Sequence, residues 1–243
     1  MKETNMDACI IGYTQIVPAV RQQWETAGVE KPSDPLHVVE NCASVCYDSV
    51  PDKENHRITR NCIASGHLSV LEHISFTFHI SGVSRSLLAQ LTRHRHASFS
   101  VRSQRYCNEV GFEVVVPDAC EGNADFNSAI DEMRYSYGKM TGDGIRPEDA
   151  RAVLPNACCT ELCMTMNARA LIEASHLRLC NRAQKEIREL FQRLKEEVEC
   201  VCPEIAELMV PQCEKHKGYP FCTELKSCGK RPKIGEVYGN KII

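Results

Sequence analysis

The stretch from Arg93 to Tyr106 carries the clearest chemical signal in the sequence. Its fourteen residues, Arg-His-Arg-His-Ala-Ser-Phe-Ser-Val-Arg-Ser-Gln-Arg-Tyr, include four arginines and two histidines, although the whole chain has a formal net charge of −3. Guanidinium groups stay charged at any working pH and present several fixed donors, which suits phosphate and carboxylate groups. Clustered positive charges repel one another, so this pattern predicts that an anion binds here.

The elements before this stretch would hold its first arginines in place. Apolar and polar residues alternate from Ile74 to Ser81, which predicts a half-buried strand. The apolar run from Ser84 to Gln90 then predicts a short helix that ends near Thr92. A strand followed by a helix would therefore lead directly into the anion-binding segment.

Strands and helices alternate irregularly along the rest of the chain. The patterns predict strands at residues 8–13, 112–116 and 160–166, and helices at 37–45, 126–140 and 183–199, with the last as the longest. Pro147 marks another helix start, and Asn167 caps a helix that runs to about Arg178. No Gly-x-Gly-x-x-Gly motif opens a helix, and no P-loop is present. We expect an α/β (α+β) fold, a single domain over residues 1–243 with a central mixed or antiparallel sheet flanked by helices.

Composition narrows the class of protein. With 243 residues, 25% of them charged and 43% hydrophobic, the chain resembles an ordinary soluble globular domain. The net charge of −3 argues against general nucleic-acid binding. No apolar stretch approaches the roughly 20 residues that span a bilayer, and the N-terminus lacks an apolar export signal. We expect a cytoplasmic protein.

Cysteine is abundant, with fifteen residues, and without an export signal these are most simply interpreted as reduced thiols in a cytoplasm. Most cysteines lie in apolar runs, where the thiol serves as a small core side chain. The Cys-rich C-terminal tail, about residues 200–243, is different, because Cys200, Cys202, Cys213, His216, Cys222 and Cys228 lie near Pro, Gly and Lys residues. Their spacing lacks two Cys-x-x-Cys pairs, so we expect no metal site. A zinc site that uses Cys213, Cys222 and Cys228 stays open as the alternative.

Two other chemical readings are weaker. Ser103 could be a nucleophile beside His94 or His96, but no third member of a triad is evident, so phosphate binding is preferred. His67, Glu72, His73 and His79 could suggest a metal cluster. Strand alternation places His73 and His79 on a polar face, which favours solvated or hydrogen-bonded histidines over ligands.

The motif Arg93-His94-Arg95, followed after seven residues by Ser103-Gln104-Arg105-Tyr106, resembles the signature of the flavin-dependent thymidylate synthases. Further segments match that family in its order and at similar intervals, namely 66–73, 151–155, 167–169 and 177–178. The resemblance spans roughly residues 38 to 200.

The resemblance implies a reductive methylation. In that family dUMP becomes dTMP, methylenetetrahydrofolate donates the carbon, reduced FAD supplies the hydride and NADPH recharges the flavin. Because FAD, dUMP and folate are anions, several arginines would converge on them without making the whole protein basic. The family also implies a homotetramer whose active sites are shared between subunits.

The resemblance assigns roles to individual residues. FAD would be bound by Ser69, Arg93, His94, Arg95, Asn167 and Arg169. The dUMP site would include Gln90 and Arg93, acting across a subunit boundary, with Ser103, Gln104, Arg105 and Arg151 near the phosphate and sugar. Arg178 would lie against the uracil ring as the catalytic residue. Its positive charge would stabilise an N3-deprotonated or enolate-like form and raise the electron density at C5.

The chain departs from the family pattern at three positions. Val101 stands where an acid or amide is common, so a side-chain contact to substrate would be lost there. Ser100 and Glu173 stand where asparagine is common, and the flavin contact of Glu173 is not carried over. The preferred reductant and the folate contacts are not predicted.

The sequence disfavours two competing functions. A nucleic-acid-binding module could use residues 93–105 as a basic patch, but the acidic composition and the lack of interleaved aromatic residues count against it. A thymidylate synthase of the cysteine-nucleophile class would contain an active-site segment with the tripeptide Pro-Cys-His. That tripeptide does not occur in the chain.

Overall fold

The computed structural model describes residues 5–26, 34–215 and 221–238. The chain divides into two compact units, which are described separately. The first unit comprises Met1–Ala8, His79–Arg95 and Phe99–Met164, and the second comprises Cys9–Phe78, His96–Ser98 and Thr165–Ile243. A single domain over residues 1–243 stays a prediction.

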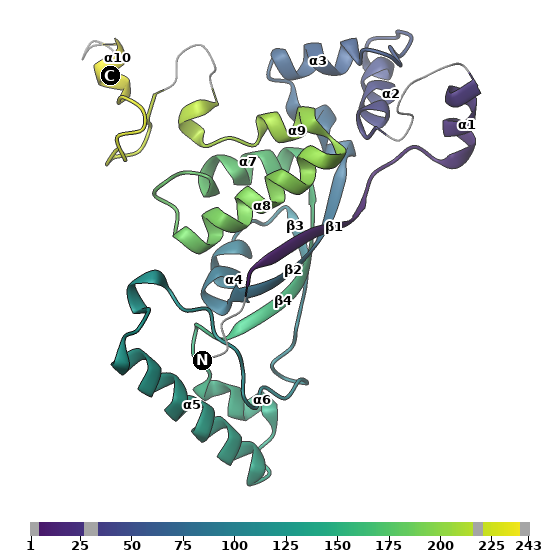
Figure 1. Cartoon of the computed structure of the whole chain (residues 1–243). Helices are drawn as coiled ribbons and strands as arrows, with labels where there is room; N and C mark the ends of the chain where they lie inside the picture. Colours follow the sequence, from purple (N-terminus) through teal and green to yellow (C-terminus); the bar gives the residue numbers. More distant parts are fainter. Residues whose placement is uncertain (1–4, 27–33, 216–220, 239–243) are drawn as a thin grey trace. The chain divides into compact units, whose positions relative to one another are not determined.

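One four-stranded antiparallel sheet is formed by β1 (Asp7–Tyr13), β2 (Ser75–Ser84), β3 (Ala97–Val101) and β4 (Cys159–Asn167), in the order β1-β2-β4-β3 (Figure 1). The alternation predicted for β2 is confirmed, because Phe76, Phe78 and Ile80 are buried while the residues between them are half-exposed. Hydroxyl groups also pair across neighbouring strands, with Thr77 Oγ1 3.0 Å from Thr165 Oγ1. The combination of a sheet with helices confirms the expected fold class.

The first unit contains several short helices and one of 19 residues. Its helices are α4 (Arg85–Leu91), η2 (Asp118–Cys120), α5 (Ala124–Gly142), α6 (Pro147–Ala150) and η3 (Arg151–Val153). Ser84 begins α4, since its hydroxyl accepts a 3.0 Å hydrogen bond from the Leu87 amide, and Asn123 caps α5 in the same way. Such caps satisfy amide groups that lack a partner in the first turn of a helix. The Ser84 cap and the buried Leu87 and Leu91 fix where the arginine-rich segment starts.

The second unit is mainly helical. Its helices are α1 (Pro18–Thr26), α2 (Leu36–Cys46), α3 (Arg57–Ala64), η1 (Leu68–His73), α7 (Ala168–Arg178), α8 (Lys185–Val201), α9 (Pro203–Leu208), η4 (Gln212–Glu214) and α10 (Ile234–Tyr238). The predicted stripe of α8 is confirmed, because Ile187, Leu190, Phe191, Leu194 and Val198 are all buried. One apolar face per helix is the pattern expected when a helix packs on a core.

Two expectations about elements are corrected, and one strand was missed. Residues 112–116 do not form a strand, and Val114 makes only an isolated antiparallel bridge with Cys158. Their apolar character reflects burial, because Phe112 and Val114 belong to a core cluster with Ile130 and Cys158. Among the described residues α5 is the longest helix, with 19 residues against 17 in α8. The strand β3 was not predicted.

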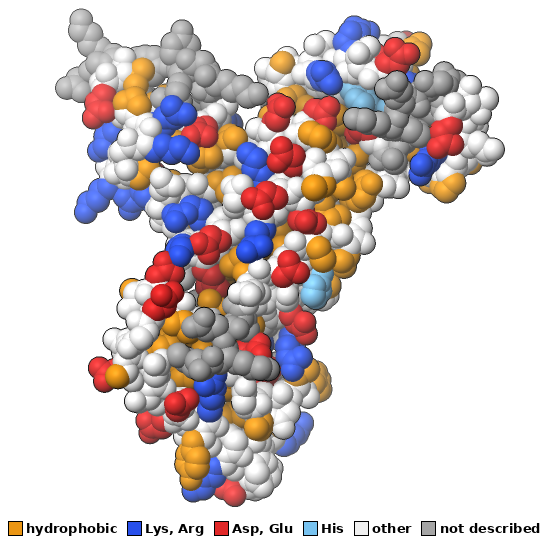
Figure 2. All heavy atoms as spheres, viewed as in Figure 1, with side chains coloured by type: hydrophobic (Ala, Val, Ile, Leu, Met, Phe, Trp, Pro, Cys, Tyr) orange, Lys and Arg blue, Asp and Glu red, His pale blue; other side chains and the backbone are white. Residues whose placement is uncertain are grey.

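The charged side chains on the face shown in Figure 2 are interspersed, with basic and acidic groups side by side. That face therefore offers no extended basic surface of the kind that nucleic-acid binding uses. Within the described residues, the helices are too short or too polar to cross a bilayer.

Candidate active site

The Arg-His-Arg segment forms a turn directly after α4. The amide of Arg93 donates to the Gln90 carbonyl (3.4 Å) and the amide of His94 donates to the Leu91 carbonyl (3.1 Å). Arg93 and Arg95 are exposed, and within the described parts of the chain neither side chain has an ion pair or hydrogen bond. Two guanidinium groups are therefore held on a defined turn without a carboxylate to neutralise them, which suits an anionic ligand.

The segment after β3 is a tight turn built on Ser103. The Ser103 carbonyl accepts from the amides of Cys107 (2.9 Å) and Tyr106 (3.3 Å), and its hydroxyl accepts from the Arg105 amide (3.2 Å). The Gln104 side chain donates to Cys158 Sγ at 3.5 Å, whereas Arg105 is exposed. This turn therefore anchors Gln104 at the protein core and leaves the Arg105 guanidinium accessible to a ligand.

Arg105 and Arg151 both contact Glu148. Arg105 Nε donates to Glu148 Oε2 (2.7 Å), Arg146 Nη2 lies 2.7 Å from Glu148 Oε1, and Arg151 Nε donates to the Glu148 carbonyl (3.2 Å). The hydrogen bond from Arg105 and the charges of the three arginines hold the pKa of the Glu148 carboxyl below its ordinary value, against the opposite effect of partial burial. Three guanidinium groups around one carboxylate leave a net positive site.

Glu148 is a site residue that sequence reasoning missed. Its place beside Pro147 predicted only a helix start, which the structure confirms in α6. One partner of its carboxylate, Arg105, is 43 residues away in the sequence. Glu148 lies in the sequence between the two family-matching segments that contain Arg105 and Arg151, and this position was the signal that could have indicated its role.

In the second unit, Asn167 and Arg169 are set by the start of α7. Asn167 Oδ1 accepts a 2.8 Å hydrogen bond from the Ala170 amide, so the predicted cap is confirmed. Arg169 Nη1 donates to Glu72 Oε1 (2.7 Å) and Arg169 Nε donates to Glu173 Oε1 (3.0 Å). Because Ser69 and Glu72 belong to η1, which packs against α7, the expected flavin residues of this unit come from neighbouring elements.

Glu173 changes the electrostatics at Arg169. The hydrogen bond that Arg169 donates to Glu173 is the largest of several effects that raise the pKa of Arg169. The hydrogen bond that Arg169 donates to Glu72 is the second largest. All three side chains are largely exposed, so solvent weakens these ion pairs and an incoming anion could compete with them. Because glutamate replaces the common asparagine at position 173, a carboxylate contacts Arg169, which is expected to bind the flavin.

Arg178 is the last residue of α7 and is half-buried. Burial lowers the pKa of Arg178 from its ordinary value, yet a guanidinium group keeps its proton at any working pH. The helix is continuous from Ala168 to Arg178, as predicted, so at 1.5 Å per residue Asn167 and Arg178 lie about 16 Å apart.

The structure thus gathers the predicted residues into local groups. The first unit holds Gln90, Arg93, His94, Arg95, Ser103, Gln104, Arg105 and Arg151, and the second holds Ser69, Asn167, Arg169 and Arg178. Contacts join Arg105 to Arg151 through Glu148 within the first unit. In the second unit Asn167 and Arg178 occupy opposite ends of one helix.

Comparisons with known proteins show the family of this chain. A family model described as thymidylate synthase complementing protein matches residues 29–204. A flavin-dependent thymidylate synthase from Geobacter sulfurreducens is 41% identical over 225 residues, covering 86% of this chain and 96% of that protein. This chain belongs to the flavin-dependent thymidylate synthases.

Two more relatives of this flavin-dependent thymidylate synthase support the assignment. One from Clostridium tetani is 33% identical over 240 residues, with 86% of this chain and 95% of that protein covered. A crystal structure of thymidylate synthase X from Helicobacter pylori, which contains FAD and dUMP, has a TM-score of 0.66 and 26% identity. That likeness covers 87% of this chain and 100% of the Helicobacter pylori chain, so the fold is shared nearly throughout.

Proposed function

We propose that this chain catalyses the reductive methylation of dUMP to dTMP in de novo dTMP biosynthesis. Methylenetetrahydrofolate would donate the carbon and NADPH would recharge the flavin. Bound FAD, once reduced, supplies the hydride. Membership of the flavin-dependent thymidylate synthases supports this proposal, together with the complete Arg93 to Tyr106 motif.

The arrangement of Arg105 and Arg151 around Glu148 is the observation that carries the proposal. Both guanidinium groups are exposed, and they come from segments separated by more than forty residues. The Ser103 hydroxyl belongs to the same turn as Arg105 and accepts a hydrogen bond from the Arg105 amide. A nucleotide phosphate needs charged donors from more than one direction, so Ser103, Gln104, Arg105 and Arg151 would bind dUMP through its phosphate and sugar.

The residues expected around FAD have the chemistry that a dinucleotide requires. Arg93 and Arg95 lack carboxylate partners among the described residues, and Asn167 caps an eleven-residue helix whose start carries Arg169. Helix N-termini and guanidinium groups both favour phosphates. Ser69, Arg93, His94, Arg95, Asn167 and Arg169 would hold the FAD.

Arg178 would act on the uracil ring. Its guanidinium is partly removed from water, which strengthens its effect on charge that develops nearby. The positive charge would stabilise the ring with N3 deprotonated, or its enolate-like form, and so raise the electron density at C5. This role requires no cysteine nucleophile.

We further propose that the protein is a cytoplasmic homotetramer, with active sites shared between subunits. In this assembly Gln90 and Arg93 would contact a dUMP molecule held mainly by another subunit. The exposed position of Arg93 on the turn after α4 leaves it available for such a contact.

The proposal is tested with the purified full chain. The protein should carry an oxidised-flavin spectrum, or acquire it when FAD is added. NADPH should bleach that spectrum, and dUMP should perturb it. With dUMP, methylenetetrahydrofolate and NADPH, chromatography should detect dTMP. A protein that takes up no FAD, or that forms no dTMP when all co-substrates are present, would refute the proposed function.

A further inference from the structure

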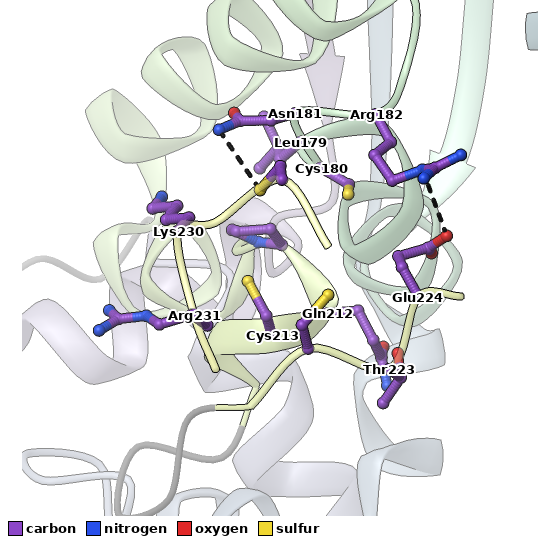
Figure 3. Close-up of a pocket in the computed structure, with 13 residues that line it drawn as sticks. Leu179, Cys180, Asn181, Arg182, Gln212, Cys213, Thr223, Glu224, Lys230 and Arg231 are labelled. Atoms are coloured by element: carbon purple, nitrogen blue, oxygen red, sulfur yellow. Dashed lines mark hydrogen bonds and ion pairs between the residues drawn. The ribbon is translucent and has the colours of Figure 1, made fainter. Parts of the chain in front are cut away.

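Four cysteines line one pocket in the second unit, and the lining residues of this pocket include none of those proposed above to bind FAD or dUMP. Figure 3 shows Cys180 and Cys213 on opposite sides of this pocket. Cys180 follows α7 and Cys213 lies in η4, while Cys222 and Cys228 come from the C-terminal segment, and all four line the pocket. Sequence spacing alone did not suggest Cys180 as part of this group, because it is more than thirty residues from the next member.

We propose that Cys180, Cys213, Cys222 and Cys228 form a structural zinc site. Four thiolates in tetrahedral coordination are a characteristic ligand set for Zn²⁺ in structural sites. The pocket encloses a cavity of about 20 Å³, which is room for a single water-sized particle and far too little for a nucleotide or a flavin. The size of the cavity and the type of lining residue therefore point to an ion.

The C-terminal segment gains little stability from the buried side chains that the structure describes in it. Among the residues of 221–238 whose burial is described, Cys222 is buried and the others are half-exposed or exposed. Segments of this size usually require a metal or a disulfide to hold a fixed structure. All four cysteines are free thiols.

The backbone of the segment brings its two cysteines close to the pocket. The Cys222 amide donates to the Pro232 carbonyl at 2.7 Å, which closes the loop that contains Cys228. Gly229 adopts φ +85°, a left-handed conformation that glycine adopts readily, directly after Cys228. Asn181 Nδ2 lies 3.8 Å from Cys228 Sγ, so the thiol already faces the residue next to Cys180 (Figure 3).

The charges around the pocket suit a zinc–thiolate centre. Zinc with four thiolates carries a net charge of −2, and the pocket is lined by three cations, of which Arg182 pairs with Glu224 while Lys230 and Arg231 share Glu214. Arg231 Nε is buried and lacks a hydrogen-bond partner within the described residues, although Arg231 Nη2 contacts Glu214 at 3.4 Å. Buried donors of this kind are satisfied by an anionic acceptor nearby.

Zinc binding would be coupled to closure of the segment. Within the described residues, no group of three Cys, His, Asp or Glu side chains is placed to hold a metal, and His216 lies outside those residues. The four side chains would therefore move together when the ion binds. Four thiols would release their protons to solvent as four sulfur–zinc bonds form, with no change of oxidation state.

Metal analysis of the full chain tests the proposal. Protein kept reduced with a phosphine should be exposed to Zn²⁺, freed of unbound ion and analysed by plasma mass spectrometry, and about one zinc per chain is expected. Cys213→Ser and Cys228→Ser should each lower the zinc content at least fivefold. Cys200→Ser, which changes an exposed cysteine of α8 outside the pocket, should leave it unchanged.

Cobalt provides a second readout that does not depend on enzyme activity. Co²⁺ added to the metal-free chain should give the intense visible and thiolate charge-transfer bands of tetrahedral sulfur coordination, and Cys228→Ser should abolish them. FAD content is measured in the same samples, so failure of this proposal is distinguished from failure of the proposed function. Wild-type protein without zinc and without these cobalt bands, or full zinc content in both pocket variants, would overturn the proposal.

Discussion

Arg105 Nε donates a 2.7 Å hydrogen bond to Glu148 Oε2, which joins the turn after β3 to the start of α6. The same glutamate accepts a hydrogen bond from Arg151 through its backbone carbonyl. Glu148 thus fixes the direction of Arg105 and lies next to Arg151. The guanidinium groups of these two arginines are proposed to bind the dUMP phosphate. It is a positioning residue, because its own carboxylate would repel the phosphate.

Glu148→Gln is expected to weaken dUMP binding. The neutral amide accepts a weaker hydrogen bond than a carboxylate, so Arg105 would lose its fixed direction. We expect the KM for dUMP to rise roughly two- to fivefold, a small effect because the Arg105–Glu148 ion pair is partly exposed. The FAD content should change little. Steady-state kinetics measures this change, and Glu132→Gln, an exposed glutamate of α5, is the control. An unchanged KM in Glu148→Gln would show that Arg105 needs no such partner.

The Arg105–Glu148 pair should also make stability depend on pH. The pKa of Glu148 is lowered in the folded protein, so its contribution is present above the ordinary glutamate pKa and is lost as the pH falls through the folded value. The difference in Tm between wild type and Glu148→Gln should therefore be constant near neutrality and shrink in acid. Thermal melts followed by circular dichroism measure it. A difference that grows as the pH falls would contradict this origin.

Features with a local cause were predictable from the sequence. Asn167 was recognised as a cap because its hydrogen bond reaches only three residues ahead. The alternation of β2 was recognised because burial on one face repeats every second residue. Non-local contacts were not accessible, since Arg169 binds Glu72 across 97 residues.

The errors have physical causes too. Phe112 and Val114 are apolar because they pack on α5, and periodicity reports burial without reporting a strand partner. The strand β3 escaped prediction because Ser98 and Ser100 are exposed and its other residues are only half-buried, so it carries little apolar signal. The convergence of Cys180 with the C-terminal cysteines likewise depends on tertiary packing.

Substitution of Asn167 should separate its structural role from its ligand-binding role. Asn167→Ala removes the cap of α7 and should lower the free energy of unfolding by about 1 kcal/mol as well as the FAD content. Asn167→Ser keeps a capping oxygen but lacks the amide, so it should restore stability without restoring FAD binding. Urea unfolding and flavin absorbance measure the two effects. Full FAD content in Asn167→Ser would show that Asn167 caps α7 but that its amide does not contribute to FAD binding.

Glu173→Asn should tighten FAD binding. The substitution removes one of the two carboxylates that contact Arg169, and with it a negative charge near the expected flavin phosphates. We expect the Kd for FAD to fall roughly two- to fivefold at low salt, with a smaller effect at high salt. Glu25→Asn is a matched control, because Arg21 and Glu25 form an Arg–Glu pair with the same 3.0 Å distance on α1. Weaker FAD binding in Glu173→Asn would mean that Glu173 helps to position Arg169.

Arg178→Ala should abolish dTMP formation while the protein keeps its FAD. The guanidinium is half-buried at the end of α7, where loss of its charge would leave developing negative charge on the uracil ring unsupported. We expect turnover to fall by roughly 100-fold or more, the scale seen when one stabilising donor is removed from an active site. The ratio of flavin to protein absorbance and the yield of dTMP are measured on the same preparation.

Two further variants sharpen this test of Arg178. Arg178→Lys retains the charge but not the planar set of donors, so its turnover should lie between wild type and Arg178→Ala. Arg193→Ala changes an exposed arginine of α8 and should behave as wild type. Unchanged turnover in Arg178→Ala would remove its catalytic role. A loss of turnover that parallels a loss of bound FAD would instead assign Arg178 to holding the flavin.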